Sequence, residues 1–105
     1  MVKINFKKIK IYKDIAKTKV AVVDKQEEVA NDLYEKGLGI GFHALALKIY
    51  NADGEIELDD KEYGLLMTYA NQMCTPAIID AFNAFKNEAL NNIEEEKIVQ
   101  HKLNK

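Results

Sequence analysis

Hydrophobic side chains alternate with polar ones at the start of the chain and follow a longer period afterwards. The alternation covers residues 2–12, a connection rich in polar residues follows at 13–19, and a short apolar run occupies 20–23. Period-two spacing of β-branched and aromatic residues is typical of strands. We therefore predict that residues 1–23 form a short two-stranded β element. Because such a hairpin is marginal alone, one of its faces should pack on helices.

From residue 24 the hydrophobic period becomes helical. Asp24 and Glu27 have the spacing of a capping box, which predicts a helix start at this point. Lys36 and Gly37 offer a cation for the last turn and a glycine for a left-handed cap, so the helix should end near residue 35 or 36. Its apolar face consists of Val29, Ala30, Leu33 and Tyr34.

A second helical pattern opens at residues 39–41 and ends in the turn-forming segment Asn51–Gly54. The next four residues, Glu55–Leu58, alternate too briefly to predict more than an extended bridge between helices. The apolar face predicted for this second helix consists of Phe42, Leu45, Ala46, Ile49 and Tyr50.

The clearest helix start follows that bridge. Asp59 and Glu62 repeat the capping-box spacing, and Leu58 and Tyr63 have the spacing of a hydrophobic staple. The stripe of this third helix consists of Tyr63, Leu66, Met67, Ala70 and Met73.

Thr75–Pro76 predicts a fourth helix, because proline is favoured at the first helical position. Its period holds to Ile93 and degrades over residues 94–105, which we interpret as either a frayed continuation or a mobile charged tail. The apolar positions of this helix are Ile78, Phe82, Phe85, Ala89 and Ile93.

Together these patterns predict one α+β, mainly helical domain over residues 1–105. A basic β element at 1–23 packs on about four helices, whose core spans 24–93. A length of 105 residues, with 48% hydrophobic and 30% charged residues, suits one folded core.

Composition also narrows the expected location and chemistry. No apolar run approaches the roughly 20 residues of a membrane span, and the N-terminus lacks a signal-peptide pattern, so we expect a cytoplasmic protein with no membrane association. Cys74 is the only cysteine, which excludes an intramolecular disulfide and a cysteine-based zinc site within one chain.

Charge is distributed unevenly along the chain. Residues 1–19 contain seven lysines and one acid, whereas the rest contains eight lysines and sixteen acids. The lysines of the predicted strands are candidates for binding a polyanion such as nucleic acid. They also have the alternative role of protecting an exposed strand edge. Because arginine is absent and few aromatic residues are interleaved, nucleic-acid binding is not favoured. The candidate polyanion-binding residues are Lys3, Lys7, Lys8 and Lys10.

Residues 51–60 invite comparison with a calcium-binding EF-hand loop. With Gly54 at loop position six, Asn51 and Asp53 fall at ligand positions, but Ile49 occupies position one and Asp60 replaces the final glutamate. We favour a turn with glycine at a positive φ, followed by a helix cap, over this metal site.

Other chemistry-bearing residues have simpler explanations. His43 and His101 lack a sequence-adjacent nucleophile or carboxylate, and Cys74 has no basic neighbour to activate its thiol. The acids at 59–60 and 94–96 fit a helix cap and a solvated face, and the glycines at 37–41 lack the rest of a phosphate-binding motif. We therefore expect a non-enzyme with no catalytic residues, no metal and no cofactor.

The stretch from Leu45 to Asp60, followed by Thr75–Asp80, resembles small proteins encoded by bacteriophages and prophages. In those, an aliphatic helix ends in an acidic-glycine turn, and an acidic cap then leads to another helix and a proline-containing segment. The resemblance covers about Val29 to Phe85. It implies an origin on a mobile element and a part in phage assembly or host interaction, and it transfers no catalytic residue.

Three functional hypotheses follow. The first is a non-enzymatic protein-interaction module, such as a phage accessory or assembly protein, that binds a protein partner or itself and takes no small-molecule substrate. The alternatives are a nucleic-acid-associated protein that uses the lysine-rich strands and a degenerate EF-hand-like calcium-binding protein. An exposed apolar patch would favour the first hypothesis, because association requires surface to bury.

Overall fold

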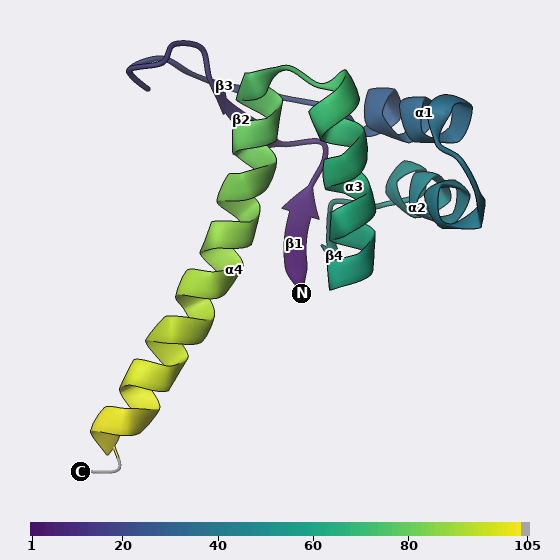
Figure 1. The fold of residues 1–105 in the computed structure, drawn as a ribbon. Coiled ribbons are helices and arrows are strands. Elements are labelled where there is room, and N and C mark those ends of the chain that lie inside the picture. The colour runs from purple at the N-terminus through teal and green to yellow at the C-terminus, as the bar shows by residue number, and fades with distance from the viewer. Residues whose placement is uncertain (104–105) are drawn as a thin grey trace.

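The computed structural model describes the backbone of residues 1–103 and the side chains of residues 1–89. Within that part, four helices and two small antiparallel sheets form an α+β, mainly helical fold, as predicted (Figure 1). The strands are β1 (Val2–Asn5), β2 (Ile9–Tyr12), β3 (Val20–Val23) and β4 (Glu55–Leu58). The helices are α1 (Gln26–Lys36), α2 (Ile40–Tyr50), α3 (Asp60–Met73) and α4 (Pro76–Leu103).

The strand pairing corrects our prediction of one two-stranded element. A turn divides the alternating segment, because Lys8 N donates to Asn5 O at 3.0 Å and Lys7 N donates to the Asn5 side chain at 3.1 Å. Strand β2 then pairs with β3, with Ile9 opposite Val23. Strand β1 pairs instead with β4, with Val2 opposite Leu58. The segment that we interpreted as a bridge is therefore a strand.

Helix α1 ends at Lys36 as predicted, but its start and its cap differ from the prediction. Lys25 N donates to Phe6 O at 2.8 Å, which holds the chain beside the strands, and the helix begins only at Gln26. Asp24 accepts from Gln26 N at 3.1 Å, so the predicted Asp24–Glu27 capping box does not form.

Gly37 is extended, with φ −72°, and so it is not the left-handed cap that we predicted. Glycine is needed there for space, because a Cβ would lie 2.5 Å from both Leu33 O and Phe42 Cβ.

Later boundaries match the sequence signals closely. Gly54 has φ +94°, as predicted for the turn after α2. At the start of α3, the Asp59 side chain accepts from Glu62 N at 2.7 Å, and Glu62 Oε1 accepts from Asp59 N at 3.0 Å. Both halves of the second capping box are therefore present. Helix α4 begins at Pro76, and its backbone includes most of segment 94–105. Residues 104–105 and the side chains of that segment lie outside the described part.

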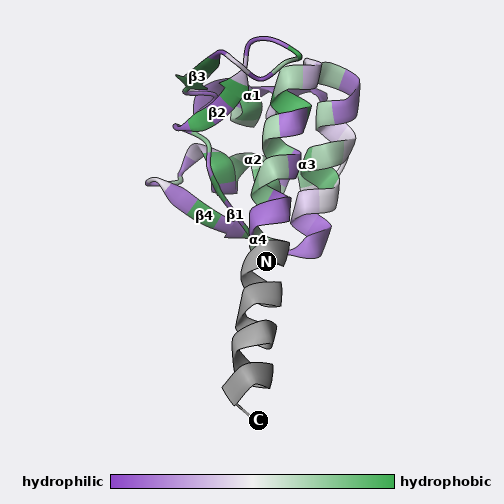
Figure 2. Ribbon diagram, turned by 90° about the vertical axis from the view of Figure 1, so that its left-hand side faces the viewer, coloured by the Kyte–Doolittle hydropathy of each residue, from purple (hydrophilic) through white to green (hydrophobic). Residues whose placement is uncertain are grey.

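The core lies where the two sheets meet the four helices. Strand β1 and helix α4 both supply fully buried side chains, as do α1, α2 and α3. Phe6 and Phe82 pack edge to face there, with ring centroids 6.0 Å apart. Figure 2 shows hydrophobic residues along the strands and on helices of the main body, with hydrophilic residues interspersed. The largest fully buried side chains are Phe6, Phe82, Ile4, Ile9, Leu33, Leu45, Ile49, Leu58 and Leu66.

Candidate functional site

The lysines predicted to bind a polyanion lie in different surroundings. Lys3, on β1, forms an ion pair with Glu57 of β4 at 3.8 Å. Lys7 lies in the turn after β1 and lines a hollow whose other charged residues are acids. Lys10, on β2, lies over the Tyr12 ring at 5.6 Å and lines a different hollow, beside α4. Lys8 is exposed in the turn between β1 and β2. The fold therefore places the four lysines in separate surroundings, and two of them, Lys3 and Lys10, have side-chain partners.

Large apolar side chains are exposed at two places. The described part has ten strongly exposed large hydrophobic residues. Five of them lie on α1, α2 or their connection, and three lie on the hairpin formed by β2 and β3. Burial of such a side chain is worth about 1.5–3 kcal/mol, so their concentration at these places marks candidate interaction surfaces.

The first surface is the α1–α2 groove, where the two helices lie side by side (Figure 1). Tyr34 is 65% exposed, Tyr50 54% and Leu47 46%. The groove has a volume of about 200 Å³, below the roughly 300–1,000 Å³ of typical small-molecule sites. Its shape suits individual protruding side chains. It is lined by Ala30, Asn31, Tyr34, Ala46, Leu47 and Tyr50.

The groove adjoins an acidic hollow, because Tyr50 lines both. This hollow has a volume of about 620 Å³. Its charged residues are three acids and one lysine, so it attracts cations. Its lining consists of Lys7, Asp24, Gln26, Glu27, Glu28, Tyr50 and Ala52.

Gln26 gives the wall of this hollow a specific polar structure. The residue is only 6% exposed, and its Nε2 donates to the carbonyls of Ile49, Tyr50 and Ala52 at 3.0, 3.1 and 2.9 Å. The amide thus caps the C-terminal end of α2 from another helix. Its Oε1 is buried and has no hydrogen-bond partner in the described part. An unsatisfied buried acceptor is uncommon.

The second surface is the hairpin tip, residues 13–19. Lys13 N donates to Lys19 O at 2.9 Å, and the Asp14 carboxylate accepts from the amides of Thr18 and Lys19 at 2.9 and 3.1 Å. It also accepts from the Thr18 hydroxyl, and these hydrogen bonds lower the pKa of Asp14. The turn is thereby closed on itself. It presents Ile15, which is 101% exposed, between exposed lysines.

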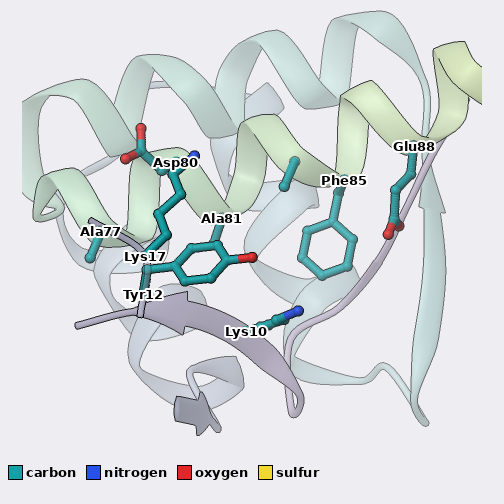
Figure 3. Close-up of a pocket in the computed structure, with 9 residues that line it drawn as sticks. Lys10, Tyr12, Lys17, Ala77, Asp80, Ala81, Phe85 and Glu88 are labelled. Carbon is teal, nitrogen blue, oxygen red and sulfur yellow. The ribbon is translucent and has the colours of Figure 1, made fainter. Parts of the chain in front are cut away.

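A third hollow, of about 220 Å³, lies between β2 and α4 (Figure 3). Tyr12 lies at its centre, with the ammonium groups of Lys10 and Lys17 at 5.6 and 5.5 Å from the ring. Asp80 and Glu88 face it from α4. Two cations and two anions balance there, so this hollow has no preference for a charged ligand.

Among residues 1–89, Cys74 and His43 are the remaining candidates from the sequence. Cys74 is half-buried, and burial raises the pKa of its thiol, which disfavours the nucleophilic thiolate. His43 is exposed and its ring lies 5.6 Å from that of Tyr34, while the His101 side chain lies outside the described part.

Among residues 1–89, the groups whose pKa departs from its ordinary range are Asp14, Tyr63, Tyr69 and Cys74. None of these residues lines any of the three hollows.

Two acids at the end of segment 51–60 and in the following turn have partners within the protein. Asp59 binds the Glu62 amide, and both Glu62 carboxylate oxygens accept from Lys48 Nζ at 2.9 Å. Across the residues that the structure describes, no group of three or more histidine, cysteine, aspartate or glutamate side chains is placed to hold a metal ion. In the same part of the chain, no helix is both long and apolar enough to cross a bilayer.

Sequence reasoning did not identify the groove or the acidic hollow. It assigned Tyr50 to a buried face and gave Gln26 no role, although both residues define the candidate site. The signal that was present is the width of the apolar pattern on α2, where Leu47 adds a hydrophobic position outside the predicted face. Comparison with known proteins adds nothing to these observations, because no family model, curated protein or solved structure matches the chain.

Proposed function

We infer that this chain is a protein-interaction module whose binding surface is the α1–α2 groove together with the acidic hollow. The observation that carries this inference is the exposure of Tyr34, Leu47 and Tyr50 around one hollow. Aromatic side chains are enriched in protein interfaces, and an exposed apolar groove gains free energy when a partner covers it. The acids beside Tyr50 add a preference for a partner with positive charge.

The size of the complex that contains the chain in its native cells tests this function. We expect the wild-type protein to elute from a sizing column well above its monomer mass of 11.9 kDa. Leu47→Gln should shift it toward the monomer, because a polar side chain in the groove weakens apolar contact. Met73→Gln is the matched control, since both side chains are 46% exposed and Met73 lies outside the groove. Elution of the wild type as a monomer from a concentrated extract at low salt would refute the proposal.

Polyanion binding is the weaker candidate, because its four lysines lie in separate surroundings and two of them already have side-chain partners. Its remaining support is the exposed lysines of the hairpin tip. It requires retention on nucleic acid at low salt and weaker retention after Lys7, Lys8 and Lys10 are neutralised. Absence of retention at low salt would remove this candidate.

We also propose a cytoplasmic location and an origin on a mobile element. The single cysteine is consistent with a reducing compartment. The phage resemblance of the helix and turn pattern supports the origin, and the genes beside the coding sequence test it. A run of virion-structure genes would agree with the proposed origin, whereas housekeeping genes would contradict it.

A further inference from the structure

We propose that the partner is a second copy of this chain, whose hairpin tip inserts Ile15 into the α1–α2 groove and directs a lysine into the acidic hollow. The proposal rests on the function assigned to the groove above and identifies the partner. Two surfaces of the same chain have complementary chemistry. The hairpin tip is apolar and basic, and the groove with its hollow is apolar and acidic.

The hairpin tip is prepared for insertion. The hydrogen bonds to Asp14 fix the turn, so little conformational freedom is lost when it binds. Ile15 is 101% exposed, so it makes no contribution to the core of its own copy. A fixed turn with an isoleucine at its tip and lysines on both sides presents a hydrophobic anchor with a cationic rim.

The receiving surface places an apolar groove next to an acidic hollow. The groove has room for individual side chains, and Tyr50 connects it directly to the acidic hollow. Asp24 and Glu27 are exposed there, whereas Glu28 already pairs with Lys25 at 2.8 Å and Lys7 supplies one cation. Gln26 lines the hollow, but its unpartnered Oε1 has almost no exposed surface, so the charge of the acids is what attracts a cation there. An ammonium group is a donor with three protons, so it can interact with more than one of these acids.

The two surfaces cannot meet within one molecule. Figure 1 shows the hairpin turn at one end of the structure and α1 and α2 at the other end. Contact between them therefore requires two copies. In each such contact, one copy contributes its hairpin tip and the other contributes its groove. Because a tip buries much less than the roughly 800 Å² per partner of a standard interface, the association should be weak and sensitive to salt.

Sedimentation of the purified chain at increasing concentration tests the proposal. We expect reversible association that weakens at least tenfold when ionic strength rises from about 0.05 M to about 0.5 M. Ile15→Asp, which blocks the tip, and Leu47→Gln, which blocks the groove, should each reduce association at least tenfold. Met73→Gln should leave it unchanged. A mixture of the two blocked variants should form a 1:1 pair, because one variant keeps a functional tip and the other a functional groove.

A monomer at all concentrations would overturn the proposal, and so would blocked variants that fail to pair on mixing. A monomeric purified chain that still occurs in a large complex in cell extract would overturn the self-association and leave the proposed function intact. If the purified chain binds nucleic acid through its hairpin tip and its copies do not associate, the second copy would likewise be rejected as the partner. Circular dichroism of each variant establishes that it folds, which is expected because Ile15 is fully exposed and Leu47 nearly half exposed.

Discussion

At the residue scale, two polar contacts connect elements that are distant in sequence. Gln26 of α1 binds three carbonyls at the end of α2. Tyr69 of α3 donates from its hydroxyl to Asp32 Oδ2 of α1 at 2.8 Å. Gln26 and Tyr69 are both buried. If one partner of either contact is removed, the other partner is left without a hydrogen bond inside the protein, which lowers the free energy of unfolding. These two residues fix the position of α1, on which one wall of the groove depends.

Replacement of Gln26 by leucine should lower the free energy of unfolding by about 1–3 kcal/mol, because the carbonyls at the end of α2 lose their donor inside the protein. Urea denaturation followed by circular dichroism measures the change. Gln72→Leu is the control, since Gln72 is exposed on α3. Equal stability of the Gln26 variant and the control would show that the amide does not cap α2.

Alkaline pH should destabilise the protein through Tyr69 and Cys74. Burial raises the pKa of Tyr69 above its ordinary 10.0, with added contributions from the Cys74 thiol and the Asp32 carboxylate, and burial raises the pKa of Cys74 above its ordinary 9.0. The folded state therefore keeps protons that the unfolded state releases. This stabilisation is complete below about pH 9 and is lost as pH rises further.

The free energy of unfolding, measured as a function of pH, tests whether stability falls above about pH 9. Tyr69→Phe should be less stable near neutral pH, because the hydrogen bond to Asp32 is lost, and its stability should fall less steeply above pH 9. Tyr34→Phe is the control, because Tyr34 is 65% exposed. A slope above pH 9 that is unchanged in Tyr69→Phe would contradict the assignment.

At the element scale, two glycines differ in whether the surrounding structure leaves room for a side chain. A Cβ on Gly37 would collide with Phe42 and with the Leu33 carbonyl at the α1–α2 connection. A Cβ on Gly64, inside α3, would meet no atom within 4 Å. The same substitution should therefore have opposite effects at the two positions.

Gly64→Ala should raise the free energy of unfolding by about 0.5–1 kcal/mol, the usual gain from alanine in a helix interior. Gly37→Ala should lower it by about 1–3 kcal/mol, as overpacking typically does. Thermal denaturation of both variants beside the wild type measures the difference. A stabilising effect at Gly37 would show that α1 and α2 are not held as closely as the structure places them.

The elements differ in how well local sequence predicts them. The start of α3 was predictable because Asp59 and Glu62 satisfy each other's backbone amides without help from the rest of the fold. The same spacing at Asp24 and Glu27 failed, because the Lys25 amide is held by Phe6 from the strand region. The pairing of β1 with β4 joins residues that are at least 50 positions apart in the sequence. Alternation indicates that a segment is extended, and it carries no information on its partner.

At the scale of the whole molecule, the β1–β4 pairing ties the N-terminus into the centre of the fold. Ile4 is fully buried opposite Ile56, whereas Ile15 at the hairpin tip is fully exposed. The apolar residues of the basic N-terminal segment thus serve two purposes, one in the core and one at the surface. The groove was not predictable from sequence, because helical periodicity does not show which apolar positions the neighbouring elements leave uncovered.

Ile4→Ala should lower the free energy of unfolding by about 2–5 kcal/mol, since it opens a cavity where β1 meets the core. Ile15→Ala should change it by less than about 0.5 kcal/mol, because the side chain has no contacts to lose. Chemical denaturation of the two variants provides the comparison. Similar effects at both positions would contradict the separation of core and surface along this segment.

The measurement that tests the central claim most directly is photo-cross-linking from single positions in living cells. A photoreactive side chain at position 47 should give a discrete adduct, because Leu47 lines the α1–α2 groove. The same group at position 73 should give none, although Met73 is equally exposed. An adduct of twice the chain mass would identify the second copy as partner. Adducts from position 73 and none from position 47 would show that the groove is not the interaction surface.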